Sequence, residues 1–124
     1  MPVKRVLVIE GEVEDRRRLT AELSSHGFDV RACKDGVSAI HELEESHGKS
    51  RHFDFVVTDA RLTDISGMKI LRVLKTAWPQ LPMLVIAEAA SDELDADVAE
   101  FENTSLLTRP IEPEQVVAAL GRLE

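Results

Sequence analysis

The stretch Phe55-Val56-Val57-Thr58-Asp59 predicts a buried strand that ends in a carboxylate. A run of mainly apolar residues this short is typical of a strand that is covered on both faces, as in a parallel sheet. Gly67 follows eight residues after Asp59 and precedes a helical pattern. In open α/β sheets, ligands bind at the carboxyl ends of the strands. Asp59 is therefore the first candidate functional residue.

Apolar runs and amphipathic stretches alternate along the rest of the chain. Strands are expected at 6–9, 28–33, 53–59, 83–87 and 105–108, and helices at 13–25, 37–46, 70–78, 91–101 and 113–123. Gly27 is placed to end the first of these helices, Ser91 to cap the fourth and Pro113 to begin the last. The pair Asp35-Gly36 predicts a turn, and residues 47–52 predict a polar loop.

Strands that alternate with helices indicate a parallel sheet with helices on both faces. Right-handed crossovers favour a doubly wound, flavodoxin-like (βα)5 fold of three layers, in which the five strands take the order 2-1-3-4-5. The switch point of that order lies between the first and third strands. Their carboxyl ends carry Glu10 and Asp59, so we expect these two carboxylates to lie side by side.

The composition narrows the class of protein. The chain has 124 residues, enough for one core, and we expect a single domain over 1–124. Its formal net charge of -8 argues against direct contact with nucleic acid. No apolar segment is long enough for a signal peptide or a membrane span, so we expect a cytoplasmic location and no membrane partner. The single cysteine, Cys33, is expected to be a half-buried strand residue.

The carboxylates after the first and third strands suggest a cation site. Glu10, Glu12 and Asp59 would repel one another at one sheet edge unless they are solvated or a cation lies between them. Oxygen ligands of this kind suit Mg²⁺, which commonly takes one or two protein carboxylates together with water and phosphate. The alternative is that Glu10 and Glu12 are solvated loop residues and that Asp59 belongs to a turn.

Four blocks at their joint spacing resemble the receiver domain of bacterial two-component response regulators. They are residues 6–12, residues 59–62 with Gly67, residues 82–87, and Arg109-Pro110. The resemblance implies that Asp59 accepts a phosphoryl group from a sensor histidine kinase or a histidine phosphotransfer protein. It implies that Mg²⁺ is held by Glu10, Asp59 and the backbone carbonyl of Arg61, and that Arg109 contacts the phosphoryl oxygens.

The chain departs from the family pattern at several of these positions. Gly11 lies where a second acidic residue is usual, and Ala87 lies where a threonine or serine hydroxyl contacts the phosphoryl group, so that Ala87 offers only its backbone. Arg109 replaces a lysine, Thr63 replaces a common proline, and Leu106 lies where an aromatic switch residue is frequent. The resemblance therefore implies an atypical receiver with weakened Mg²⁺ binding and altered switching.

Two residues leave alternatives open. Glu12 either reaches the cation and compensates for Gly11, or it is an exposed residue at the start of a helix. Arg109 either pairs with a phosphoryl group or forms a standing ion pair with Asp59 or Glu10 that imitates a locked state, because its planar fork differs from the ammonium of lysine.

Two charged surfaces are candidate partner sites. The expected fourth helix carries acidic residues at Asp92, Glu93, Asp95, Asp97, Glu100 and Glu102. The resemblance implies that the face made by the fourth helix, fifth strand and fifth helix docks an output domain or downstream protein, and that the first helix, with its basic run 16–18, meets the kinase. Both surfaces are equally consistent with solvated helix exteriors. The four histidines lack metal-ligand spacing and are interpreted as surface residues.

Three functions follow from these patterns. The first is a phosphoryl-accepting receiver, which is not an enzyme beyond its own phosphorylation and dephosphorylation at Asp59. The second is a pseudo-receiver that acts as a phosphorylation-independent interaction module. The third, an FMN protein or a phosphatase, is disfavoured because residues 10–12 would repel a phosphate and because Arg61 lies where a phosphatase would need a second aspartate. We expect either a single-domain regulator or an N-terminal domain, as a monomer or weak homodimer.

Overall fold

The computed structural model describes residues 3–46, 52–61 and 67–123, apart from the side chains of Gly67 and Met68. Strands and helices alternate along these residues. The strands are β1 (Arg5–Ile9), β2 (Asp29–Cys33), β3 (Phe55–Asp59), β4 (Met83–Ala87) and β5 (Thr104–Thr108). The helices are α1 (Val13–Ser25), α2 (Gly36–Ser46), α3 (Gly67–Ala77), α4 (Asp92–Ala99) and α5 (Pro113–Leu123).

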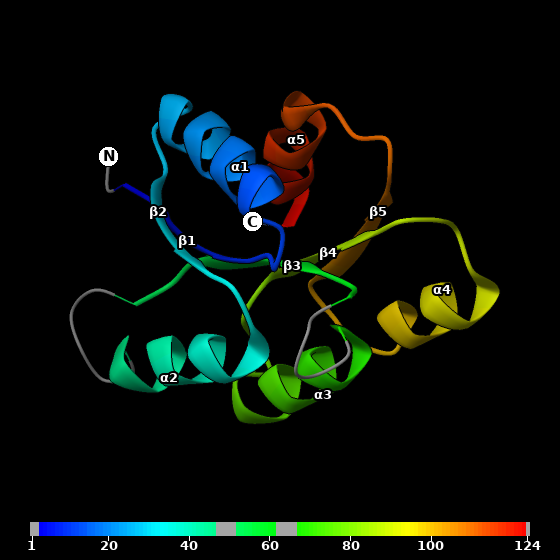
Figure 1. Ribbon diagram of the computed structural model, residues 1–124. Coiled ribbons are helices and arrows are strands. Elements are labelled where there is room, and N and C mark those ends of the chain that lie inside the picture. Colours follow the sequence, from blue (N-terminus) through cyan, green and yellow to red (C-terminus); the bar gives the residue numbers. More distant parts are fainter. Residues whose placement is uncertain (1–2, 47–51, 62–66, 124) are drawn as a thin grey trace.

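The strands form one parallel sheet of order β2-β1-β3-β4-β5, as the sequence predicts. Helices α1 and α5 cover one face of the sheet, and α2 and α3 cover the other (Figure 1). Helix α4 lies beyond α3, at the β5 edge (Figure 1). The prediction of a doubly wound three-layer fold is confirmed.

Strand residues alternate between two hydrophobic clusters, because successive side chains point to opposite faces of a sheet. Val6, Val8 and Val57 pack with α1 and α5. Leu7 and Val56 pack with the helices on the other face. All residues of β3 and β4 are buried, which explains why these two strands are continuous apolar runs in the sequence.

Most of the predicted helix ends are confirmed. Gly27, two residues after the last residue of α1, has a φ of 90°, a conformation that glycine adopts without strain. The Ser91 hydroxyl accepts a hydrogen bond from the Leu94 amide at 3.3 Å, and Pro113 is the first residue of α5. Asp35-Gly36 is not a free-standing turn, because the Asp35 carboxylate accepts a hydrogen bond from the Ser38 amide at 2.9 Å and thereby caps α2.

Some apolar positions of the predicted helices face solvent. Val13 is 46% exposed and Val37 is 64% exposed, although both share the helical spacing of apolar residues in their helices. Each lies in the first turn of its helix. Cys33 is half-buried as expected, and His26, His41 and His52 are exposed. The predicted loop 47–52 and Thr63 fall, apart from His52, outside the described residues.

A buried lysine ties α3 to the rest of the fold. Lys75 is only 4% exposed, and its Nζ donates hydrogen bonds to the carbonyl oxygens of Leu81 at 2.6 Å and Glu102 at 2.8 Å. Burial lowers the pKa of the Lys75 ammonium, against the opposing charge of Glu102. The lysine thus joins the segments that lead into β4 and β5, and it satisfies two carbonyl groups that those strands leave open.

We expect Lys75→Met to lower the free energy of unfolding by about 1–3 kcal/mol, because the longer part of the side chain is kept while both carbonyl groups lose their donor. Urea unfolding followed by circular dichroism measures this. The matched control is Lys34→Met at an exposed position, which should stay within about 0.5 kcal/mol of the original protein. Equal effects of the two substitutions would contradict a structural role for Lys75.

Candidate functional site

The register of the sheet brings four charged residues together at the carboxyl ends of the strands and on one face of the sheet. They are Glu10, Asp59, Glu88 and Arg109. Ile9 lies beside Thr58 and Asp59 beside Ile86, so Glu10 follows β1 at the level of Asp59. Ala87 lies beside Thr108, so Glu88 and Arg109 follow their strands at one common level. Alternation places all four on the face that α1 and α5 cover. They line one open cleft together with Gly11, Glu12, Asp15 and Arg61.

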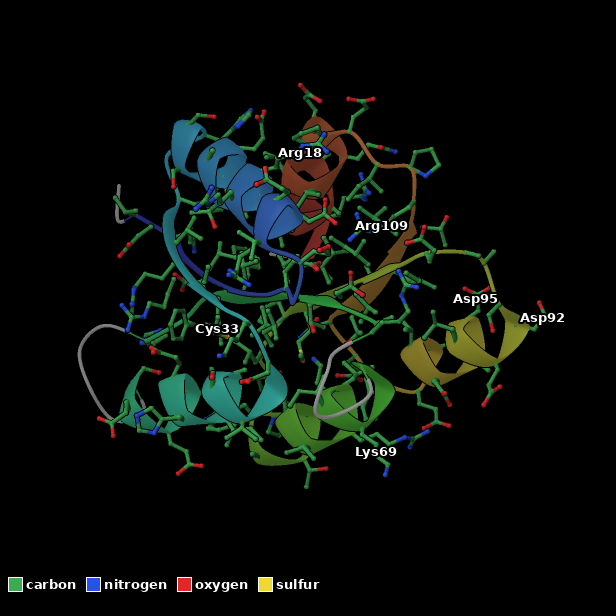
Figure 2. The ribbon with its side chains drawn as sticks, in the orientation of Figure 1. Arg18, Cys33, Lys69, Asp92, Asp95 and Arg109 are labelled. Atoms are coloured by element: carbon green, nitrogen blue, oxygen red, sulfur yellow. The ribbon has the colours of Figure 1, made fainter. Side chains whose placement is uncertain are left out.

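Arg109 is the central cation of this cleft. Its Nη2 lies 2.9 Å from Asp59 Oδ2, 3.4 Å from Glu10 Oε2 and 3.9 Å from Asp15 Oδ2. Figure 2 labels Arg109 on the segment that leads from β5 towards α5. Arg109 thus forms an ion pair with Asp59, and Glu10 lies within reach of the same nitrogen.

Backbone groups hold the two buried carboxylates in place. Asp59 Oδ1 accepts a hydrogen bond from the Arg61 amide at 2.7 Å, and Glu10 Oε1 accepts one from the Glu12 amide at 3.0 Å. Arg16 Nη1 donates to the Glu10 carbonyl oxygen at 2.9 Å, which ties α1 to the end of β1. Asp59 is 6% exposed and Glu10 is 3% exposed, so the interpretation of either as a solvated turn or loop residue is wrong.

The environment raises the pKa values of both Glu10 and Arg109, but for different reasons. Burial raises the pKa of the Glu10 carboxyl from its ordinary 4.5 to about 7, and the hydrogen bond and negative charge of Asp59 add to the rise. For Arg109, burial acts to lower the pKa, but the hydrogen bond and charge of Asp59 and the charges of Asp15 and Glu10 outweigh it and raise the pKa. The environment thus keeps the Arg109 guanidinium charged and leaves the Glu10 carboxyl partly protonated near neutral pH.

Two residues of the cleft are absent from the sequence-based candidates. Asp15 lies in the first turn of α1, three residues after Glu12, and contributes the third carboxylate near Arg109. Glu88 follows β4 directly, and its Oε2 lies 2.9 Å from Arg61 Nη2 and 3.5 Å from Arg109 Nε. The signal for Glu88 was its place at the carboxyl end of a buried strand, the same signal that selected Asp59.

The remaining candidate positions lie as follows. Gly11 is half-buried in the cleft, and Glu12 is exposed at the start of α1. Ala87 is 3% exposed, and its carbonyl oxygen accepts a hydrogen bond from the Arg109 amide at 2.8 Å. Leu106 is half-buried against the cluster that includes α3 and α4. The Arg61 side chain points to Glu88, while its backbone lies against Asp59.

The donor set is suited to a hard divalent cation of small size. Glu10 and Asp59 supply oxygens from two adjacent carboxylates. Mg²⁺ commonly takes one or two protein carboxylates. Among the residues that the structure describes, no group of three or more His, Cys, Asp or Glu side chains is arranged to hold a metal ion. A cation at this place would compete with Arg109 for the same oxygens.

A family model of the response regulator receiver domain matches residues 6–121. The chain belongs to this family. It is thus a receiver domain of the kind found in two-component response regulators, a class of signalling domains that typically bind Mg²⁺ in an acidic pocket and are in general not catalytic enzymes.

Curated relatives and solved structures agree with this assignment. The chain is 27% identical over 118 residues to the cell cycle transcriptional regulator CtrA of Caulobacter vibrioides, covering 94% of this chain and 48% of CtrA. It is 29% identical over 125 residues to the response regulator MprA of a Mycobacterium species, covering 99% of this chain and 51% of MprA. The chain thus spans about half the length of these relatives.

The fold of this chain is shared with solved receiver proteins. The chemotaxis response regulator CheY4 of Vibrio cholerae superposes with a TM-score of 0.85 at 19% identity, covering 99% of this chain and 100% of that one. A response regulator receiver protein from Pseudomonas putida gives a TM-score of 0.86 at 20% identity, covering 98% of each chain. Within the described part of the chain, none of the helices has the length and apolar character needed to cross a membrane.

The raised pKa of Glu10 has a consequence for stability. A carboxyl whose pKa is higher in the folded state than in the unfolded state binds its proton more tightly when folded. Its stabilising contribution is therefore fully present below pH 4.5 and is lost as the pH rises towards about 7.

We expect the free energy of unfolding of the original protein, relative to Glu10→Gln, to fall between pH 4.5 and 7.5 by on the order of 2–3 kcal/mol. Urea unfolding of both proteins in a chelating buffer measures the difference at each pH. The comparison removes the titration of all other groups that the two proteins share. A difference that stays constant over this range would contradict the assigned environment of Glu10.

Proposed function

We propose that this chain is a phosphoryl-accepting receiver domain and that Asp59 is the acceptor. The observation that carries the proposal is a buried carboxylate at the end of β3 with a second carboxylate, Glu10, beside it and the Arg109 guanidinium 2.9 Å away. Phosphoryl transfer depends mainly on positioning and on neutralisation of charge. This cleft supplies a fixed oxygen nucleophile and a cation for the phosphoryl oxygens.

The transfer takes place in one step at phosphorus. A carboxylate oxygen of Asp59 forms a bond to phosphorus while the P–N bond of the donor phosphohistidine breaks, and the histidine nitrogen keeps the electron pair. The Arg61 amide holds one oxygen of Asp59 at 2.7 Å and orients the carboxylate. The N–H groups of Arg109 form a planar fork that matches the oxygens of a phosphoryl group.

Mg²⁺ is the cofactor that this donor set suits. Glu10, Asp59 and the backbone carbonyl of Arg61 would hold it, and when bound it neutralises charge on the phosphoryl group. We propose that its affinity is low, since Gly11 supplies no side-chain ligand and Arg109 already occupies oxygens of both carboxylates. Glu12 is exposed, which favours the second of its two alternatives. In this sense the receiver is atypical.

The switching step is also expected to be altered. Ala87 has no hydroxyl to follow a phosphoryl group, and Leu106 replaces the frequent aromatic switch residue. The expected partners remain a sensor histidine kinase or phosphotransfer protein at α1, and an output domain or downstream protein at α4, β5 and α5. On α4, Asp92, Glu93 and Asp95 are exposed and available to such a partner.

A second candidate function is a phosphorylation-independent interaction module. The observation that favours it is the ion pair of Arg109 with Asp59, since a cation already bonded to the acceptor resembles the arrangement that a phosphoryl group would otherwise induce. The two functions differ in whether Asp59 takes up a phosphoryl group, which is a question of chemistry and is open to direct measurement.

We expect the purified protein, incubated with a small phosphodonor such as acetyl phosphate and excess Mg²⁺, to gain the mass of one phosphoryl group. Intact-mass spectrometry detects this species. The matched control is Asp59→Ala, which should remain at its original mass. A protein that stays unmodified, or a phosphorylated species that survives the substitution, would overturn the proposal in favour of the interaction module.

Restoring the missing acidic residue should strengthen the cation site. We expect Gly11→Asp to tighten Mg²⁺ binding by about tenfold, because the affinity of oxygen sites rises with the number of charged ligands. Isothermal titration calorimetry measures the dissociation constant. The control is Glu12→Asp, which places an aspartate at the neighbouring position without adding a charge. Unchanged affinity in Gly11→Asp would show that the loss at this position does not limit the site.

A further inference from the structure

Glu88 links the cleft to the segment that carries α4. It is the first residue after β4 and lies three residues before Ser91, the cap of α4. Its carboxylate oxygen Oε2 lies 2.9 Å from Arg61 Nη2 and 3.5 Å from Arg109 Nε. The carboxylate therefore connects the path between β4 and α4 to both arginines of the acceptor site.

Arg109 is shared between Glu88 and the acceptor through one edge of its guanidinium. Nε faces Glu88 at 3.5 Å, and Nη2 faces Asp59 at 2.9 Å. These two nitrogens lie on the same edge of the planar group, and this edge is one that binds two phosphate oxygens side by side. A phosphoryl group on Asp59 that took this edge would therefore replace Glu88 at Nε.

The charges favour that exchange. A phosphoryl group carries about -1.5 to -2 at neutral pH, more than the single charge of the carboxylate that it modifies. Glu88 would then keep only Arg61, and the two side chains of that pair are 58% and 71% exposed. Exposed pairs contribute little to the stability of a fold. The path from β4 to α4 would lose one of the two ion pairs that tie Glu88 to the acceptor site.

Helix α4 is held mainly at its other end. Arg72 of α3 pairs with Asp97 at 3.0 Å and with Glu100 at 3.3 Å, and Val98 is the buried residue of the helix. The first turn begins at Asp92 and is exposed, and Figure 2 shows Asp92 and Asp95 at the end of α4 that lies away from the sheet. Glu88 is thus the charged anchor nearest to the free end of this helix.

We propose that Glu88 couples the charge on the acceptor to the position of the β4–α4 segment, because it competes with Asp59 for Arg109. It would thereby take the role that a hydroxyl at position 87 would otherwise have. This inference rests on the proposed function, because it requires that Asp59 accepts a phosphoryl group. The coupling uses ion pairs in place of a hydroxyl that follows the phosphoryl oxygens. It makes Glu88 a positioning residue that acts through Arg109.

Hydrogen exchange at the start of α4 tests the coupling. The Leu94 amide bonds to the Ser91 hydroxyl and the Asp95 amide to the Ser91 carbonyl oxygen, so both report on this end of the helix. We expect beryllofluoride with Mg²⁺, which imitates the phosphoryl group, to speed exchange at these amides by about two- to fivefold in the original protein. In Glu88→Gln, exchange should be faster by a similar factor before the mimic is added, and the mimic should change it little.

The matched control is Glu44→Gln, which removes the same charge from an exposed position on α2 and should behave as the original protein does. Binding of the mimic is followed separately by fluorine NMR, with Asp59→Ala as the negative control. If the mimic binds and Glu88→Gln responds as fully as the original protein, the coupling through Glu88 is overturned while the receiver function stands. If the mimic does not bind at Asp59, the proposed function fails and the coupling with it.

Discussion

Two buried carboxyl groups follow or end neighbouring strands, and one guanidinium lies against both of them. Glu10 and Asp59 lie side by side because β1 and β3 are parallel and in register. Isolated in the interior, such a pair would repel and would be costly to keep ionised. Arg109 lies at 2.9 Å from one and 3.4 Å from the other and makes the arrangement tenable. The contacts of Asp59, Glu10 and Glu88 in the cleft all meet at this residue.

The same ion pair sets up a competition. Under the proposed function, a divalent cation would compete for the carboxylate oxygens that Arg109 contacts, and a phosphoryl group would compete with Glu88 for Arg109 itself. In a receiver with a lysine at this position, the cation is a single flexible ammonium, whereas arginine offers several fixed donors along a plane. The substitution therefore increases the number of groups that one side chain can connect. The ion pairs of the cleft share Arg109 and Glu88, so substitutions among these residues are expected to be non-additive.

A second network holds the outer helix. Asp97 of α4 and Glu100, which caps the end of α4, pair with Arg72, so part of the acidic surface predicted for a partner is used within the fold. The exposed part is narrower and lies towards the start of the helix. On α1, Arg16 donates to the end of β1, so that it belongs to the frame of the site and is not a free basic side chain. In both helices, some charged residues of one run bond within the fold and the others remain on the surface.

The sequence by itself determined the order of elements, the order of the strands and the edge at which the chemistry lies. The elements follow from the periodicity of short segments, and the strand order follows from the general right-handedness of crossovers. It also placed Glu10 and Asp59 together and identified Arg109 as their altered cation. Only the tertiary structure decided that Arg109, 50 residues from Asp59 and 99 from Glu10, bonds to Asp59. Likewise, only the structure brought Asp15 and Glu88 into the cleft, because the direction of a side chain beyond a strand end depends on the packing of several segments and not on its own neighbours in the chain.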